Sequence, residues 1–230
     1  MLSNILFERV KEIWEESCNK AFVLDMARGC LDDGRFRYYM IQDFLYLQDY
    51  IDILKLMLDK TNDPEIIDFL DITINATEHE TEMVHIPNMK KLGIGEDEIN
   101  SIPQGMASKE YIGYMKGIIR DSGVLAGLAA LLHCSWVYAY IAEEVGKRYE
   151  NEISGSDHKD WFDAYRDISY RESNQLWIDL IDKKTDGIRD QEKEALCQIF
   201  ERCAIYENKF WDMVYDANIK LYENKGQSPK

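Results

Sequence analysis

Apolar residues recur at intervals of three and four along nearly the whole chain, and no segment alternates apolar with polar residues as a half-buried strand does. The pattern is clearest in one stripe that comprises Phe36, Tyr39, Met40, Phe44, Leu47, Ile51 and Leu54. Neither an internal repeat nor a linker rich in proline, glycine or serine divides the chain. The sequence therefore predicts one all-α domain over residues 1–223, followed by a frayed tail at residues 224–230.

Turn and capping signals set the expected helix boundaries. Asp63 followed by Pro64 predicts a helix start, with the aspartate as the cap and the proline in the first turn. Pro87 is expected to kink this helix or end it early, because proline lacks a backbone donor and clashes with the preceding turn. Residues 93–105, which contain glycines and Pro103, are expected to form a loop with at most one helical turn. The expected helices span residues 2–20, 35–60, 64–92, 106–120, 124–148, 161–184 with a break near Ser173, and 189–223, with a turn at 121–123 and a polar connection at 150–156.

The most apolar stretch, residues 124–142, approaches the length of a membrane span. It is interrupted by Gly127 and by the run of His133, Cys134 and Ser135, which a hydrocarbon interior would tolerate poorly. Charged residues follow the stretch on one side only. We therefore expect the buried central helix of a globular protein and no membrane partner.

Charge and cysteine usage bear on the function classes that remain. The chain carries 43 acidic and 27 basic residues, for a formal net charge of −16, so its surface should repel nucleic acids and anionic membranes. Its five cysteines are an odd number, form no Cys-x-x-Cys pair and follow no secretory signal. The sequence therefore predicts a cytoplasmic protein with reduced thiols and no nucleic-acid partner.

Three residues in expected helices are candidates for chemistry. Cys134 lies within the apolar stretch, where its surroundings favour a buried structural cysteine, because a thiol becomes nucleophilic only where a neighbour stabilises its thiolate. Glu207 lies in a largely aromatic helix, where a carboxylate is either exposed or tuned for proton transfer. Asp43 raises the same question, because it shares a helix face with Tyr46 and Tyr50.

Two competing sites are also present in the sequence. Cys203 and Glu207 are four residues apart on one expected helix and form a rival thiol–carboxylate pair. Glu82 and His85 match the Glu-x-x-His element of helical di-iron proteins, and Glu78 lies one turn earlier. Such sites need two copies of the element, and the sequence contains one, so a metal site is disfavoured. No glycine-rich phosphate loop is present, which excludes a Walker-type nucleotide site.

Three sequence blocks in order along the chain carry a family resemblance. They are residues 36–47 (FRYYMIQDFLYL), residues 131–138 (LLHCSWVY) and residues 206–215 (YENKFWDMVY). Together they resemble the TenA (thiaminase II) family, and the resemblance covers nearly the whole chain. It implies a heme-oxygenase-like multi-helix bundle that holds no haem. Two positions depart from the family pattern, since His133 replaces a proline and Ser135 replaces an aromatic residue, and neither change removes a catalytic group.

The resemblance also implies roles for single residues. It places the family's nucleophilic cysteine on Cys134 and its catalytic glutamate on Glu207, so that Cys203 loses its claim. It places on Asp43 the aspartate that pairs with the ring nitrogen and amino group of a pyrimidine, with Tyr46 beside it. The other substrate-binding positions fall on Tyr111, Tyr138, Tyr165 and Phe210.

The activity implied by the resemblance is that of an aminopyrimidine aminohydrolase (thiaminase II) in thiamin salvage. Such an enzyme hydrolyses 4-amino-5-aminomethyl-2-methylpyrimidine, and thiamin, to 4-amino-5-hydroxymethyl-2-methylpyrimidine by cysteine nucleophilic catalysis. The family implies a homotetramer and requires neither a metal nor an organic cofactor. Two alternatives stay open: an oxygenase of the same fold, either cofactorless or with metal ligands Glu78, Glu82 and His85, and a non-catalytic regulatory protein.

Overall fold

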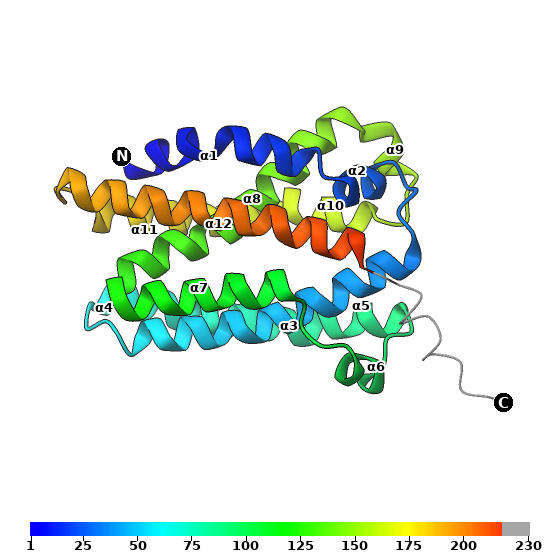
Figure 1. Ribbon diagram of the computed structural model, residues 1–230, viewed down its shortest axis with the longest axis horizontal. Helices are drawn as coiled ribbons and strands as arrows, with labels where there is room; N and C mark the ends of the chain where they lie inside the picture. Colours follow the sequence, from blue (N-terminus) through cyan, green and yellow to red (C-terminus); the bar gives the residue numbers. More distant parts are fainter. Residues whose placement is uncertain (218–230) are drawn as a thin grey trace.

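The computed structural model describes residues 1–217, except for the side chains of Met83 and Val84. Within this part of the chain, all regular secondary structure is helical (Figure 1). The long helices are α1 (Leu2–Cys18), α3 (Asp33–Leu58), α4 (Pro64–Glu80), α7 (Met106–Ser122), α8 (Val124–Arg148), α11 (Ile168–Lys184) and α12 (Asp190–Asp216). The shorter elements are α2 (Ala21–Ala27), the π-helical turn η1 (Thr81–His85), α5 (Ile86–Lys91), α6 (Glu96–Ser101), α9 (Glu150–Ser154) and α10 (Lys159–Arg166). The all-α prediction is thereby confirmed for the described residues.

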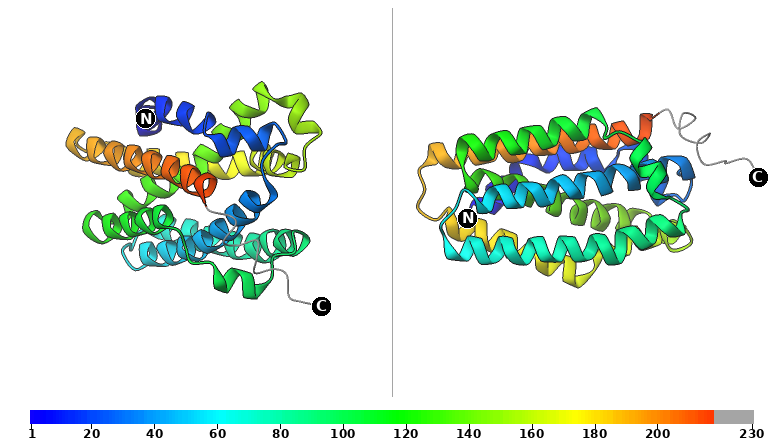
Figure 2. Two further views of the ribbon diagram at one scale, coloured as in Figure 1. Left: turned by 45° about the vertical axis from the view of Figure 1, so that its right-hand side comes forward. Right: turned by 90° about the horizontal axis from the view of Figure 1, so that it is seen from below.

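Helix α8 crosses the bundle obliquely and is its central element (Figure 1). It packs against α12, α11, α10, α7 and α1. Helix α3 packs against α4 and α7, and α12 packs against both α1 and α7. Figure 2 shows that the long helices other than α8 run roughly along one direction. Helices α3, α7, α8 and α12 all contact one another.

Helix α8 also has the length and composition of a membrane span, with a hydropathy of 1.7 over an 18-residue window. A core helix of a globular protein passes the same test, and 61% of that window is buried inside the protein. Residues 126–133 are all buried by neighbouring helices. The structure thus places residues 124–142 in the expected central helix.

Local capping chemistry begins two helices, and at α4 it does so where the sequence predicts. Asp63 accepts hydrogen bonds of 3.0 and 3.4 Å from backbone N–H groups in the first turn of α4, and Pro64 occupies the first helical position. Asp32 caps α3 in the same way. Gly123 alone connects α7 to α8, with φ at 83°, a left-handed conformation that favours glycine. The turn expected at 121–123 is shorter than predicted, because α7 runs two residues further.

The helix expected over residues 64–92 is interrupted at Thr81. There α4 gives way to the π turn η1, and α5 begins at Ile86 with Pro87 in its first turn. Pro87 has no N–H to donate to the carbonyl four residues earlier, and its ring clashes with that carbonyl, so the chain takes a wider turn ahead of it. In place of the kink or early end expected from Pro87, the structure has a π turn ahead of Pro87, and the helical conformation continues to Lys91.

Other boundaries differ from the prediction. The region 161–184 breaks at Asp167 rather than near Ser173, because Asp167 leaves the helical conformation and its carboxylate accepts a 2.8 Å hydrogen bond from the N–H of Ser169 to cap α11. Helices α6 and α9 form in segments expected to be loops, and both carry acidic residues in the first turn, where the helix dipole favours them.

The last helix is shorter than the predicted span of 189–223. Helix α12 ends at Asp216, and Ala217 already has an extended backbone. The end predicted at residue 223 and the frayed tail predicted at 224–230 lie outside the described residues.

Candidate active site

The three candidate residues lie away from the helix ends: Asp43 on α3, Cys134 on α8 and Glu207 on α12. The charge of Glu207 raises the pKa of Cys134, and the charge of Asp43 raises the pKa of Cys134 and of Glu207. Helices α3, α8 and α12 pack against one another, and the Tyr46 hydroxyl of α3 donates a hydrogen bond to the Cys134 sulfur of α8. The structure therefore brings one thiol and two carboxyls from distant parts of the sequence into one buried site.

Cys134 is half-buried and accepts a hydrogen bond from a tyrosine. The hydroxyl of Tyr46 donates a hydrogen bond of 3.1 Å to the Cys134 sulfur. Burial raises the pKa of Cys134 well above its ordinary value, the charge of Glu207 raises it further, and the bond from Tyr46 lowers it. The resting sulfur is therefore a neutral thiol, and a nearby base must take its proton before it can act as a nucleophile.

Glu207 is such a base. Its side chain lies in the interior, with 3% of the residue exposed. Burial raises the pKa of Glu207 to about 8, a hydrogen bond from the Tyr138 hydroxyl lowers it, and the charge of Asp43 raises it. A carboxyl with this pKa exchanges protons near neutral pH, which suits general acid–base catalysis.

Asp43 is the second buried carboxyl, with 7% of the residue exposed. Burial raises the pKa of Asp43 to about 6, while His85 lowers it and Glu80 raises it. The Nδ1 atom of His85 lies 3.6 Å from Asp43 Oδ2. A carboxylate that is withdrawn from water but still ionises near neutral pH can accept hydrogen bonds from the amino group and protonated ring nitrogen of a heteroaromatic ligand.

Aromatic side chains surround these groups. The rings of Tyr138 and Tyr165 are 5.0 Å apart, and the charge of Asp43 raises the pKa of both hydroxyls in addition to the larger effect of burial. The Tyr165 hydroxyl is hydrogen-bonded to Tyr39, which also accepts a 3.0 Å bond from the Trp161 indole N–H. The structure thus places the predicted residues Tyr138 and Tyr165 side by side near Asp43.

Tyr111 and Phe210 take separate places in the aromatic wall. The Tyr111 ring lies 6.1 Å from that of Tyr46 and stacks on Tyr206 at 5.5 Å. Phe210 lies three residues after Glu207 on α12, is 5% exposed and packs edge-on against Tyr39 with ring centroids 6.2 Å apart. Both predicted residues therefore contact aromatic rings of the site.

His133 occupies a structural position behind Tyr111. Its Nε2 accepts a 3.0 Å hydrogen bond from the Trp14 indole N–H, which leaves the proton on Nδ1, 3.3 Å from the Tyr111 hydroxyl. Burial lowers the pKa of His133 to about 3, so the ring is neutral. The histidine orients the Tyr111 hydroxyl.

The rival thiol, Cys203, accepts a hydrogen bond from Tyr111, the tyrosine that His133 contacts, but it is not exposed to solvent. It is fully buried, and burial raises its pKa, while a hydrogen bond from Tyr111 lowers it and the charge of Glu207 raises it. Cys134 is the less buried of the two thiols. The accessible thiol of the site is therefore Cys134.

The ligands predicted for the metal alternative do not converge. The carboxylate of Glu78 forms an exposed ion pair of 3.3 Å with Lys55, Glu82 is exposed, and His85 faces Asp43. Among residues 1–217 there is no group of three or more histidine, cysteine, aspartate or glutamate side chains placed to hold a metal ion.

Some residues around the site were not predicted from the sequence. Tyr170 on α11 donates a 3.0 Å hydrogen bond to the Ser135 carbonyl, and the charges of Cys134 and Asp43 raise its pKa in addition to burial. His85 was considered only as a metal ligand. Spacing within one helix does not reveal that His85 faces Asp43 or that Tyr170 bonds to Ser135, because these partners lie on other helices.

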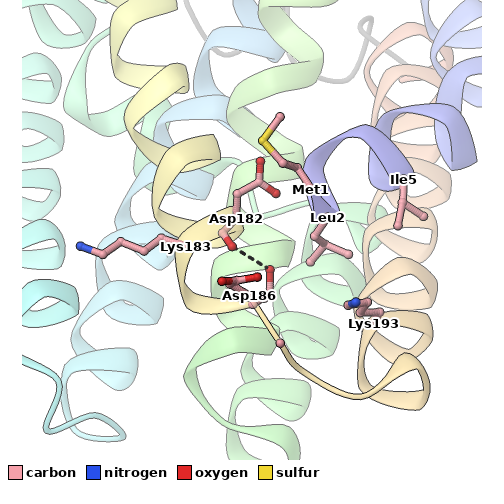
Figure 3. Close-up of a pocket in the computed structure, with 9 residues that line it drawn as sticks. Met1, Leu2, Ile5, Asp182, Lys183, Asp186 and Lys193 are labelled. Atoms are coloured by element: carbon pink, nitrogen blue, oxygen red, sulfur yellow. Dashed lines mark hydrogen bonds between the residues drawn. The ribbon is translucent and has the colours of Figure 1, made fainter.

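A separate cavity of about 370 Å³ lies where the start of α1 meets the end of α11 (Figure 3). It is lined by Met1, Leu2, Ile5, Asp182, Lys183, Thr185, Asp186, Gly187 and Lys193. The carboxylate of Asp182 accepts hydrogen bonds of 2.8 and 2.5 Å from the N–H and hydroxyl of Ser3. None of the predicted site residues lines this cavity.

The chain is similar to known proteins in sequence and in fold. A sequence model described as the TENA/THI-4/PQQC family matches residues 7–217. The chain is 30% identical over 220 residues to a protein of Halalkalibacterium halodurans named aminopyrimidine aminohydrolase, covering 94% of this chain and 96% of that protein. A Helicobacter pylori protein of the same name is 28% identical over 221 residues, covering 94% and 99% of the two chains.

A solved structure supports the fold. A TenA homologue from Pyrococcus furiosus superposes with a TM-score of 0.83 at 20% identity, covering 94% of this chain and all of that chain.

Proposed function

Since this chain belongs to the TENA/THI-4/PQQC family, we propose that it is an aminopyrimidine aminohydrolase. Its substrates are 4-amino-5-aminomethyl-2-methylpyrimidine and thiamin, and its product is 4-amino-5-hydroxymethyl-2-methylpyrimidine. The observation that carries the proposal is the packing of α3, α8 and α12, which brings the Cys134 thiol together with the buried carboxyls of Asp43 and Glu207. The names of the similar proteins from Halalkalibacterium halodurans and Helicobacter pylori support the same activity.

Substrate binding uses the aromatic wall and Asp43. The flat pyrimidine buries its faces against aromatic rings supplied by Tyr46, Tyr111, Tyr138, Tyr165 and Phe210. The Asp43 carboxylate accepts hydrogen bonds from the amino group and from the protonated ring nitrogen. The proton on the ring nitrogen, which the Asp43 carboxylate stabilises, makes the ring electron-poor and prepares it for attack.

The first half of the reaction removes the leaving group. Glu207, as the carboxylate, takes the thiol proton of Cys134, and the thiolate adds to the ring carbon next to the one that carries the methylene. The ring double bond shifts toward the methylene, and the carbon–nitrogen bond breaks. Glu207 returns its proton to the departing amine, which leaves as ammonia; the thiazole of thiamin leaves without needing a proton.

The second half adds water. Glu207 accepts a proton from a water molecule as its oxygen bonds to the exocyclic methylene. The double bond returns to the ring and the carbon–sulfur bond breaks. For the aminomethyl substrate, Glu207 then gives its proton to the expelled thiolate, so that the enzyme ends the cycle as it began; for thiamin, one proton is released to solvent.

Steady-state hydrolysis of both substrates after treatment with a chelator tests the proposal. The proteins to compare are the wild type, Cys134→Ser, Glu207→Gln, Cys203→Ala and, as a control at an exposed thiol, Cys30→Ser. We expect the wild type and Cys30→Ser to turn over at the same rate, and Cys134→Ser and Glu207→Gln to lose at least about 100-fold in kcat.

Two results would overturn this proposal. Absence of turnover by a folded wild-type protein would redirect the search to the regulatory or oxygenase alternative. Cys203→Ala as inactive as Cys134→Ser would transfer the nucleophile to the rival thiol.

The proposal extends to assembly and location. We place the enzyme in the cytoplasm as a homotetramer that needs neither metal nor organic cofactor and binds no nucleic acid. The resemblance to the TenA family supports the tetramer, and the net charge of −16 supports the lack of a nucleic-acid partner. Light scattering that returned the mass of one chain would contradict the tetramer.

A further inference from the structure

His85 lies between two carboxylates. Its Nδ1 atom is 3.6 Å from Asp43 Oδ2, and its Nε2 atom is 4.0 Å from Glu80 Oε1. The side chains of His85 and Asp43 are each 11% exposed, whereas that of Glu80 is 55% exposed. The imidazole therefore connects the buried carboxyl of the candidate active site with a carboxylate at the protein surface.

The π turn is what makes this arrangement possible. Glu80 and His85 are five residues apart, and on an α-helix the neighbours on one face are three or four residues apart. A π turn closes hydrogen bonds between residues five apart, so it brings such a pair onto the same side. Because η1 spans Thr81–His85, it places His85 on the same side of the helix as Glu80 and against α3.

One ring nitrogen of His85 lacks a hydrogen-bond partner. Nδ1 is buried and makes no hydrogen bond within the described part of the chain. Buried polar atoms without partners are uncommon in folded proteins. Asp43 Oδ2 is the acceptor that faces this atom, and an approach of about half an ångström would turn their 3.6 Å separation into a hydrogen bond.

Glu80 reaches the site electrostatically even though half of its side chain is exposed. Its charge raises the pKa of Asp43, as well as that of Tyr165 and Tyr170, in each case in addition to the larger effect of burial. Glu80 therefore stands at the rim of the candidate active site rather than on an unrelated surface.

Among the described residues, His85 differs in the sign of its possible charge from the other groups that affect the pKa of Asp43 or whose pKa Asp43 affects. Those groups are Glu80 of α4, Cys134 and Tyr138 of α8, Tyr165 of α10, Tyr170 of α11, Glu207 of α12, and Tyr39 of α3 itself. Each of them is an acid, so its ionised form is negative and opposes an ionised Asp43. His85 is the group among them that can carry a positive charge.

We propose that His85 is the positioning residue of the pyrimidine subsite, holding one oxygen of Asp43 so that the other faces the aminopyrimidine, with Glu80 orienting the imidazole from the rim. In the ligand-bound site Nδ1 donates its hydrogen to Asp43 Oδ2, while Glu80 faces Nε2 from the rim. Against the larger effect of burial, His85 lowers the pKa of Asp43 and so favours its ionised form. The inference rests on the proposed function, because it assigns a pyrimidine to the site.

Calorimetric binding of 4-amino-5-hydroxymethyl-2-methylpyrimidine between pH 5 and pH 9 tests this inference without requiring turnover. The proteins are the wild type, His85→Leu, His85→Gln, Glu80→Gln and the matched control Glu82→Gln, an exposed carboxylate in the same π turn. At pH 7 we expect about tenfold weaker binding by His85→Leu, partial recovery in His85→Gln, which keeps an N–H donor, and a loss of about threefold in Glu80→Gln. Glu82→Gln should bind like the wild type. The loss in His85→Leu should shrink toward pH 9, where Asp43 ionises without help.

The outcomes separate the two proposals. A folded wild type that does not bind the pyrimidine would overturn the proposed function. Binding by the wild type together with an unchanged affinity of His85→Leu would overturn the role of His85 alone, and so would a loss of equal size at every pH, which indicates only a structural role. If circular dichroism shows that His85→Leu does not fold, wild-type affinity in both His85→Gln and Glu80→Gln would overturn it.

Discussion

The hydroxyl of Tyr46 on α3 donates a 3.1 Å hydrogen bond to the sulfur of Cys134 on α8. This bond lowers the pKa of the thiol, against the larger effect of burial and the charge of Glu207, both of which raise it. The nucleophile of the proposed reaction is therefore held as a thiol at rest, with one donor in place to stabilise its thiolate.

Replacing Tyr46 with phenylalanine should lower the reactivity of Cys134. The variant loses the donor to the thiolate, and hydrogen bonds to charged groups contribute about 1.5–3 kcal/mol, so we expect alkylation of Cys134 by iodoacetamide at pH 8 to slow about tenfold or more. Mass spectrometry of the peptide that contains Cys134 measures the rate. Tyr114→Phe, whose ring packs against that of Tyr206, serves as the control, and equal rates in Tyr46→Phe and wild type would refute the prediction.

Replacing Glu207 with glutamine should separate thiol reactivity from catalysis. The variant removes the charge that raises the pKa of Cys134, so alkylation above pH 8 should become faster than in the wild type. Hydrolysis should nevertheless fall by at least about 100-fold, because no group remains to carry protons between the thiol, amine and water. Alkylation and hydrolysis that fall together would show that Glu207 acts mainly through packing.

The buried carboxyls should lower the free energy of unfolding at alkaline pH. The folded-state pKa of Glu207, about 8, and of Asp43, about 6, both exceed the ordinary values, chiefly because of burial. The folded protein therefore binds more protons than the unfolded chain between about pH 4 and pH 8, and its free energy of unfolding should fall as the pH rises through this window.

Urea denaturation at pH 5, 7 and 9 measures this effect. Glu207→Gln should be more stable than the wild type by a few kcal/mol at pH 9, and the difference should shrink toward pH 5. A difference that does not depend on pH would mean that the carboxyl is not buried in its neutral form.

His133 should make the free energy of unfolding rise with pH, the opposite of the effect of the buried carboxyls. Burial lowers the pKa of His133 to about 3 in the folded protein, so its contribution to stability is complete above pH 6.5 and is lost as the pH falls toward 3. His133→Gln, which can keep a donor and an acceptor for Tyr111 and Trp14, should show a weaker loss of stability in acid. The exposed His79→Gln is the control. An unchanged acid unfolding midpoint in His133→Gln would contradict the prediction.

The acidity of the proposed base predicts how activity depends on pH. Glu207 must be ionised to take the thiol proton, and its pKa is about 8, so kcat/KM of the wild type should rise with pH and level off above about 8. A rate profile between pH 6 and pH 10 measures this rise. A profile that is already flat at pH 6 would assign the proton transfer to another group.

Much of the fold followed from local chemistry that one segment carries by itself. The cap formed by Asp63 before Pro64, the central helix from Val124 to Arg148 and the interruption ahead of Pro87 all depend on residues within one or two turns. The break at Asp167 was placed six residues too late, because several residues in that region can cap a helix and packing against α8 selects among them.

The candidate site followed from the sequence only through the resemblance to the TenA family, which the family comparison confirms. From spacing alone, Cys134 looked like a structural cysteine and Glu207 like either a surface or a tuned carboxylate. Their roles remain proposals, but the structure supplies the contacts on which those proposals depend, among them the bond from Tyr46 to Cys134.

The sequence by itself thus determined the helical class, the central helix and the family, since these depend on periodicity, local caps and ordered motifs. Only the tertiary structure decided which groups meet. His85 had the spacing of a metal ligand, yet the π turn directs it toward Asp43, and His133 on α8 contacts the hydroxyl of Tyr111 on α7. The pKa values of buried groups depend on dehydration and on charges carried by other helices, and neither quantity exists until the helices pack.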